Sequence, residues 1–434
     1  MTVPRELTVL LDRHLAGHLV RTADTHSYRF RYAESWLSDP NAYPVSLALP
    51  LFAPEYEGLG VRYWLRGLLP DNEARLQEIE AEYGVSRDDP YAMLAAIGED
   101  CVGAVQFAAP GRAAEIMEGR VVSSVEWLDE AAIETLLRGV AARAAPHRRV
   151  VHTGQFSLPG ALGKVALVWD AEGMRWGRPS GLRASTHILK PPMPGVTGHN
   201  ENEHFCLQLA RAVGLPAAAS RVIQFGGQRA IAVERYDRSL HADGYVRRLH
   251  QEDMAQALGL DPALKYASDT GAGIKEIVGL LRDYAFPDDV DHFIKGVGFA
   301  WLTAGTDAHL RNFSLLIEPG ANAALSPLYD VASAFGLATR GREMRNLRMA
   351  MAIGGHTALD EIGREAWVRE TQRSRLPRST LRQIASLAQT AADVAVSLAE
   401  RLTEEEGLDA KYLQRLARAV TARASRCAAE LGGR

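Results

Sequence analysis

The sequence predicts an α+β fold in two lobes, with a mixed α/β N-terminal lobe and an all-helical C-terminal lobe. Three observations lead to this prediction. The chain has 434 residues, more than one compact core usually holds. Strand-like segments are frequent up to residue 238, and beyond it apolar residues recur almost entirely at helical spacing. A polar stretch near residue 150 indicates a further boundary, so we expect three regions: residues 1–150, 151–238 and 239–434.

The composition is that of a folded globular protein, with 47% hydrophobic and 24% charged residues. A formal net charge of -4 argues against binding nucleic acid through overall positive charge, although a local basic patch could still do so. No stretch has the length of a membrane span, and the N-terminus lacks a signal-peptide apolar region, so we expect a cytoplasmic protein with no membrane contact. The cysteines are odd in number and widely spaced, which excludes a disulfide framework and a CxxC metal site: Cys101, Cys206 and Cys427.

The first region reads as mixed α/β. Residues 8–20 are typical of a β-hairpin, and residues 101–107 of a strand. Residues 69–84 predict a helix opened by Pro70 and Asp71. The spacing of leucine, isoleucine and valine over residues 126–145 predicts a second helix, with a polar linker after it.

The second region alternates strands with one helix, and the third is helical. Strands are predicted at residues 164–170, 186–192 and 228–237, and a helix over 202–213 that ends at Gly214. Helical spacing then covers residues 254–260, 273–285, 290–305, 381–402 and 411–431. The sequence has no internal repeat and no sustained heptads.

The strongest chemical pattern is an Asp-x4-Asn spacing in the segment TDAHLRN at residues 306–312. Phosphoryl transfer needs a carboxylate that accepts the proton of the attacking hydroxyl and an amide oxygen that holds Mg²⁺, and Asp307 and Asn312 fit these roles. Asp330 follows a strand-turn-strand pattern and fits a metal-binding carboxylate. The alternative is that Asp307 and Asp330 only cap helices.

The second region offers the rest of a nucleotide site. Lys190 ends a β-branched run, where a strand would direct its ammonium toward phosphate oxygens, although exposed strand-end lysines are commoner. Glu234 and Tyr236 stand where a strand leaves for the helical lobe, as a hinge beside adenine would, or they form surface ion pairs. The order of these patterns favours a protein-kinase-like fold.

A glycine-containing loop at Ser157–Lys164 precedes a strand, as a phosphate-covering loop does in kinases. It is not a Walker A loop, because Leu158 replaces the first glycine of that pattern and Val165 replaces its Ser or Thr. An ordinary glycine-rich turn is the alternative.

Other patterns fail. His199 and His204 lack the spacing of a zinc protease motif, so we interpret them as solvated residues of a loop and a helix start. No serine has the GxSxG surroundings of a hydrolase nucleophile. The Arg-rich segment Arg369–Arg382 is typical of a solvated helix face with a turn at Pro377, and less often of a patch that contacts DNA phosphates.

Taken together, the order of motifs resembles the HipA family of bacterial kinases, toxins of toxin–antitoxin pairs. The similarity covers nearly the whole chain. In the first third it rests on LALPLF, WLRGLLPDNEAR and IGEDCVGAVQF. In the remainder it rests on FSLPGALGK, THILKP, NENEHFCLQLA, AVERYDR, RLHQEDMAQALG, LKYASDTGAGI, TDAHLRNFSLL and PLYDVASAF.

The resemblance implies roles residue by residue. Asp307 would be the catalytic base, Asn312 and Asp330 would bind Mg²⁺, and Ser157 would be autophosphorylated, which expels the loop and inactivates the kinase. The residues that it implies at the ATP site are Pro159, Gly160, Ala161, Leu162, Gly163, Lys164, Lys190, Glu234, Arg235, Tyr236, Gln251, His309, Leu310, Arg311, Asn312, Tyr329 and Asp330. The chain departs from the family at Leu162, where Gln is usual, at Gly163, where Pro or Glu is common, and at Arg311, which replaces a more frequent lysine.

The resemblance also implies an ATP-dependent and Mg²⁺-dependent serine/threonine protein kinase linked to growth arrest and persistence. Its substrate would be an aminoacyl-tRNA synthetase, glutamyl-tRNA synthetase first. Its partner would be a HipB-like helix-turn-helix antitoxin, with DNA bound only through that complex. Two alternatives remain: a small-molecule phosphotransferase, which uses the same Asp-x4-Asn and Asp set, and a catalytically silent corepressor subunit.

Overall fold

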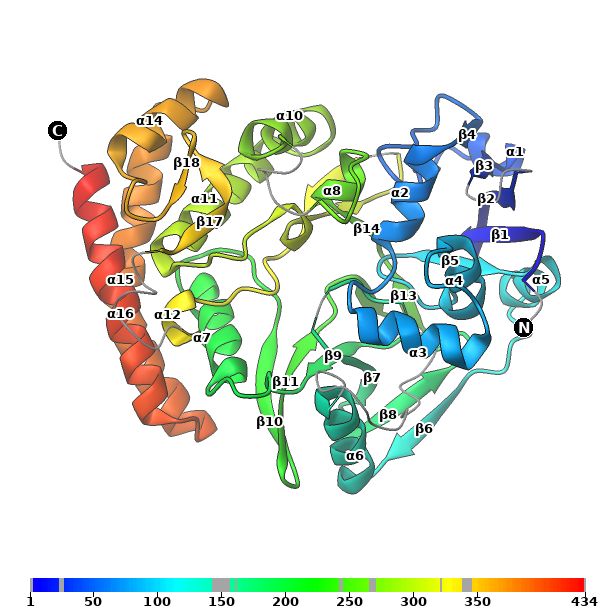
Figure 1. The fold of residues 1–434 in the computed structure, drawn as a ribbon, viewed down its shortest axis with the longest axis horizontal. Helices are drawn as coiled ribbons and strands as arrows, with labels where there is room; N and C mark the ends of the chain where they lie inside the picture. The colour runs from blue at the N-terminus through cyan, green and yellow to red at the C-terminus, as the bar shows by residue number, and fades with distance from the viewer. Residues whose placement is uncertain are drawn as a thin grey trace.

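The structure is a computed structural model. It describes residues 3–22, 27–142, 157–160, 162–241, 245–264, 271–320, 322–337 and 346–432. The chain runs from an N-terminal α/β part at one end of the molecule, through a second sheet, to a mainly helical part at the opposite end (Figure 1).

The N-terminal part is built on a five-stranded antiparallel sheet of order β4-β3-β2-β1-β5. Its strands are β1 Glu6–Leu11, β2 His14–Arg21, β3 Tyr28–Tyr32, β4 Glu55–Glu57 and β5 Val105–Ala108. The predicted hairpin is confirmed, because β1 pairs with β2. Five helices accompany the sheet: α1 Glu34–Leu37, α2 Leu59–Gly67, α3 Glu73–Tyr83, α4 Pro90–Ile97 and α5 Pro110–Met117.

The helix predicted over residues 69–84 starts four residues too early, because α3 begins at Glu73. Asn72 is the N-cap, and its side chain accepts a hydrogen bond of 3.0 Å from the backbone N–H of Arg75. The helix ends at Gly84, whose φ of 65° is left-handed. Pro70 and Asp71 therefore lie in the segment before the helix.

The second sheet has six strands in the order β10-β11-β9-β7-β8-β6. They are β6 Ser124–Leu128, β7 Val165–Asp170, β8 Arg175–Ser180, β9 His187–Lys190, β10 Ser220–Phe225 and β11 Gln228–Glu234. Helix α6 Glu130–Ala142 packs against this sheet, and α7 His199–Ala212 joins β9 to β10. Because β6 and α6 come before residue 150 yet belong here, the second sheet draws on two of the three predicted regions, and the division itself stays a prediction.

The C-terminal part is mainly helical, and its described helices include α8 Met254–Ala257, α10 Ile274–Tyr284, α11 Pro287–Thr303, α12 Ala334–Leu337, α14 Arg364–Arg373, α15 Thr380–Glu406 and α16 Ala410–Gly432. The expectation of an all-helical lobe is wrong, because this part also contains β12 Arg238–Leu240, β13 Val246–Arg248, β14 His250–Asp253, β15 Ser314–Ile317, β16 Ala323–Leu325, β17 Arg348–Ile353 and β18 His356–Ala358. Strands β15 and β16 lie in the strand-turn-strand pattern predicted before Asp330, and the other strands have three to six residues each, so they are short for a visible period of two.

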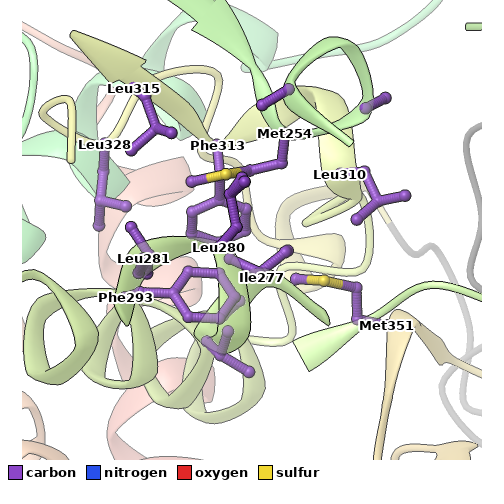
Figure 2. Close-up of a cluster of buried hydrophobic side chains, with 14 of the residues drawn as sticks. Met254, Ile277, Leu280, Leu281, Phe293, Leu310, Phe313, Leu315, Leu328 and Met351 are labelled. Carbon is purple, nitrogen blue, oxygen red and sulfur yellow. The ribbon is translucent and has the colours of Figure 1, made fainter. Parts of the chain in front are cut away.

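The three-stranded sheet β14-β15-β16 lies over a buried core and carries part of the site. Figure 2 shows this core, in which Leu310, Phe313 and Leu315 meet the helical side chains of Ile277 and Phe293. The segment with the Asp-x4-Asn pattern is thereby fastened to the core on one side.

Candidate active site

A cavity of about 280 Å³ lies where the second sheet, the N-terminal part and the C-terminal part meet. Most of the predicted site residues line it: Pro159, Gly160, Leu162, Lys164, Lys190, Glu234, Arg235, Tyr236, Gln251, Asp307, His309, Arg311, Asn312, Tyr329 and Asp330. They come from positions up to 171 residues apart, Pro159 to Asp330, and the fold alone brings them together.

Of the residues predicted at the ATP site, two do not line this cavity and one lies outside the described residues. Leu310 has no exposed surface and packs in the core (Figure 2). Gly163 lies against α6, where a Cβ would come within 2.5 Å of Cγ1 of Val140, so this glycine permits a close approach. Ala161 is not among the described residues.

The centre of the cavity is a buried lysine between two carboxylates. The Nζ of Lys190 donates to Oε1 of Glu203 at 2.7 Å and to Oδ1 of Asp330 at 2.9 Å. Burial alone would lower the pKa of Lys190, but Asp330 and Glu203 more than offset it, and the pKa is raised. Lys190 therefore stays charged, as a phosphate-binding cation must.

Within this triad of Lys190, Glu203 and Asp330, the pKa values of the two carboxyl groups are shifted in opposite directions. The Lys190 ammonium holds the pKa of Asp330 below its usual range, whereas burial raises the pKa of Glu203. Asp330 also has a φ of 55°, a left-handed conformation that Asp tolerates better than most residues. Such strain clusters at functional sites, and here it fixes the direction of an ionised carboxylate.

The segment with Asp307 and Asn312 is organised by its own hydrogen bonds. The Asn312 Nδ2 donates to the backbone oxygen of Asp307 at 2.7 Å, and the backbone N–H of His309 donates to the same oxygen at 2.8 Å. The Asp307 side chain is 71% exposed, with its Oδ1 3.8 Å from Nε2 of His309. Asp307 is thus a carboxylate that a substrate hydroxyl can reach.

Arg311 anchors this segment to the rest of the molecule. Its guanidinium contacts Oδ1 of Asp71 at 2.5 Å and Oδ2 of Asp253 at 3.1 Å. Its backbone oxygen accepts from the Tyr329 hydroxyl at 2.8 Å, so the segment is also tied to the residue before Asp330.

Strand β14 presents a different set of side chains on each face. Gln251 and Asp253 line the cavity. On the other face, a ring nitrogen of His250 lies 3.1 Å from the Val45 backbone oxygen, and Glu252 accepts from the backbone N–H of Leu47 at 2.7 Å. The period of two thus puts the cavity and the N-terminal part on opposite faces of one strand.

The predicted hinge residues take different positions. The ring of Tyr236 lies 5.6 Å from that of Tyr329, centroid to centroid, and forms an aromatic wall of the cavity. The guanidinium of Arg235 is buried and donates to Asp237, 2.8 and 3.0 Å away, and to Ser185. The Glu234 side chain is exposed, and its backbone N–H donates to Ala219.

The loop before β7 is packed against the site. Ser157 has no exposed surface, and its hydroxyl donates to the backbone oxygen of Leu68 at 2.7 Å. The Nζ of Lys164 donates to the backbone oxygen of Pro159 at 2.6 Å and closes the loop. Burial lowers the pKa of Lys164 to about 8, and the nearby Lys190 ammonium acts in the same direction.

The site suits a metal bound mainly by a nucleotide. Within the described ranges, no cluster of three or more His, Cys, Asp or Glu side chains could enclose a metal ion. Asp330 and Asn312 instead offer one carboxylate and one amide oxygen beside the cavity. Mg²⁺ is held in this way, by one or two protein oxygens together with phosphates and water.

Three further sequence interpretations have outcomes. The view that His199 and His204 are solvated is wrong: both are buried in α7, with exposed fractions of 9% and 1%. The Arg-rich segment spans the end of α14 and the start of α15, with Pro377 between them. In the described part of the chain, no helix has the length and apolar character needed to cross a membrane.

Sequence reasoning missed Glu203, Asp71 and Asp253. Glu203 lies in the polar start of α7, where no apolar period points to a site. Asp71 was assigned to a helix start, and Asp253 caps α8 and also binds Arg311. The roles of these three acids become visible only from their contacts in the fold, Glu203 with Lys190 and the two aspartates with Arg311.

Comparison with known proteins gives the family. Residues 7–108 match the family described as HipA N-terminal domain, and residues 156–398 match the HipA-like C-terminal domain. The protein named "Putative kinase Y4mE" of Sinorhizobium fredii is 37% identical over 85% of each chain. The "Serine/threonine-protein kinase toxin HipA" of Shewanella oneidensis is 26% identical over 75% of each chain. A solved structure of a Shewanella oneidensis toxin–antitoxin complex of HipA, HipB and operator DNA matches in fold with a TM-score of 0.82, at 22% identity and 98% coverage of both chains.

Proposed function

This chain belongs to the HipA family, and from that premise we propose that it is an ATP-dependent serine/threonine protein kinase. The observation that carries the proposal is the convergence on one cavity of Lys190 with its two carboxylates and of the Asp307 segment. A phosphoryl-transfer site needs these parts: a cation for the phosphates, metal-binding oxygens and a carboxylate beside the acceptor hydroxyl.

In the proposed reaction, Asp307 orients the acceptor hydroxyl and takes its proton. The hydroxyl oxygen forms a bond to the γ-phosphorus, and the bond from that phosphorus to the β,γ-bridging oxygen breaks, leaving ADP. Lys190 neutralises phosphate charge, and Asn312 and Asp330 would hold a Mg²⁺ ion, which would supply further positive charge to the transferred phosphoryl group. The aromatic wall of Tyr236 and Tyr329 gives a base-stacking surface.

The finer proposals concern regulation and partners. Ser157 is proposed as the autophosphorylated serine. Because its hydroxyl is buried against Leu68, a phosphate of nearly two negative charges there would disfavour the packed loop. A HipB-like antitoxin is the proposed partner, with DNA bound through that complex, since the Shewanella oneidensis protein of like fold is a HipA in such a complex. An aminoacyl-tRNA synthetase, glutamyl-tRNA synthetase first, is the proposed substrate.

The proposal is tested by the intact mass of the purified protein after incubation with Mg-ATP. Wild type should gain one phosphate, and Ser157→Ala and Asp307→Asn should gain none. Wild type that starts unphosphorylated and gains nothing would contradict autophosphorylation, and the absence of phosphate transfer to lysate proteins as well would refute the kinase. Transfer to free small alcohols but not to proteins would favour a small-molecule phosphotransferase.

A further inference from the structure

The segment that joins α2 to α3 lies against the Asp307 segment, although it belongs to the N-terminal part. Arg311 reaches this segment and the end of α2 with two nitrogens: Nη1 lies 2.5 Å from Oδ1 of Asp71, and Nη2 lies 3.4 Å from the backbone oxygen of Gly67, the last residue of α2. The third guanidinium nitrogen, Nε, donates to Asp253 at 3.1 Å. One planar group therefore joins two carboxylates from distant parts of the chain, which a single ammonium point charge does less well.

Local packing fixes this segment in place. A Cβ on Gly67 would come within 2.6 Å of Cγ of Gln256, so the backbone at Gly67 packs directly against the Gln256 side chain. Gln256 forms the capping box of α8 with Asp253. At the other end, the Asn72 cap sets where α3 begins. Asp71 is thus held between a close backbone contact and a helix cap, with its side chain 19% exposed.

The backbone of Arg311 is in turn hydrogen-bonded to His309 and to Tyr329. Its backbone N–H donates to Nδ1 of His309 at 3.2 Å, and its backbone oxygen accepts from Tyr329. A shift of the guanidinium moves the short 3-10 turn Leu310–Asn312, and with it Asn312 and the oxygen of Asp307 that Asn312 binds. A misplacement of about 1 Å at reacting groups can cost about 100-fold in rate.

We propose that Asp71 is a positioning residue of the catalytic segment, acting through Arg311, so that the N-terminal part completes the active site. This inference rests on the proposed kinase function. Asp71 also lines the cavity, and its carboxylate is engaged by Arg311. It holds the guanidinium that sets Asp307 and Asn312.

The first test compares Asp71→Asn with Asp89→Asn in the full chain. Asp89 is a matched control, because it is also in an N-terminal ion pair, with Arg21, and is 17% exposed. With Mg-ATP as the probe, Asp71→Asn should lower the maximal rate of phosphate incorporation about tenfold and change the half-saturating ATP concentration less than about twofold. Asp89→Asn should keep both values, and Asp71→Glu should recover part of the rate. Equal rates for the Asp71→Asn and Asp89→Asn variants in an active kinase would overturn the inference.

The second test does not depend on catalysis. Hydrogen–deuterium exchange of the backbone amides in residues 307–317 should rise in Asp71→Asn and stay at the wild-type level in Asp89→Asn. In the Arg311→Lys background, Asp71→Asn should increase this exchange by less than it does in the wild-type background. The contact between the two side chains is already weakened there. Unchanged exchange in Asp71→Asn would refute the inference even if wild type transfers no phosphate, whereas raised exchange without phosphate transfer would separate the two proposals.

Discussion

The two sides of the cavity hold their acids in opposite ways. Asp330 is bound to Lys190 at 2.9 Å, sits at a left-handed φ and shares its cation with Glu203. Asp307 has a 71% exposed side chain, and its segment is held through backbone contacts and through Arg311. Under the proposed function, the difference teaches that the side proposed to bind the metal keeps its charge fixed inside the protein, while the side proposed to hold the base stays open to an incoming hydroxyl. On the first side the acid itself belongs to a buried ion-pair network, whereas on the second side the buried ion pairs are made by the neighbouring Arg311 and the acid itself is exposed.

The largest expected effect comes from Lys190→Met, which removes the cation of the buried side. Glu203 and Asp330 would lose their shared partner, and such a loss costs about 3–5 kcal/mol. Because Asp330 is 35% exposed, solvent screens part of this cost and we expect about 3 kcal/mol. Urea denaturation measures it, and phosphate transfer should also be lost.

The control for that prediction is the double variant Lys190→Met with Glu203→Gln. It removes one unpaired buried acid, so it should regain part of the stability but none of the activity. If Lys190→Met alone unfolds at the wild-type urea concentration, the triad does not stabilise the fold and the comparison fails.

The second effect is confined to activity. Asp307→Asn should lower phosphate transfer by about 10²- to 10⁴-fold, because the acceptor hydroxyl loses its base. Since the side chain is mostly exposed, the free energy of unfolding should change by less than about 0.5 kcal/mol. Transfer kinetics and urea denaturation on one preparation check both statements, and a large loss of stability would show that the two sides are not distinct.

The smallest effect is a pH dependence at Lys164, beside the buried side. Its pKa is about 8 in the folded protein, below the usual 10.5, so between these pH values the unfolded chain binds more protons. Below pH 8 the destabilising cost of the buried ammonium is fully present, and it is relieved as the pH rises toward 10.5. From pH 7 to 9 the free energy of unfolding of wild type should therefore rise by about 1 kcal/mol relative to Lys164→Met. Parallel pH profiles of the two proteins would contradict this assignment.

The sequence predicted what short-range patterns encode. The hairpin of β1 and β2 and the long helices α11, α15 and α16 follow from apolar spacing. Helices α15 and α16 each bury one regular face, whereas β1 and the second half of α11 are buried on all sides. The strand-turn-strand pattern predicted before Asp330 contains β15 and β16, but β14 was missed, since it has only four residues and pairs with β15 some sixty residues later. The pairing of β14 with β15 depends on the tertiary fold and leaves no local pattern in the sequence.

The site divides in the same way. Asp307, Asn312 and Asp330 were predicted because their spacing matches a chemical requirement, and all three lie at the cavity. Glu203 and Asp71 were not, because each matters only through one distant partner, Lys190 or Arg311. The buried histidines of α7 were misread for a related reason: a polar run carries no sign that the rest of the chain will cover it.

The two-faced strand β14 has a consequence for how this chain can change. Its four residues are all buried, and alternate ones serve the cavity and the N-terminal part. Inserting or deleting one residue there would exchange the faces, presenting His250 and Glu252 to the cavity and turning Gln251 and Asp253 away. Surface loops tolerate changes of length, but this strand does not. A change of length in β14 would therefore disturb the cavity and the contacts to the N-terminal part at the same time.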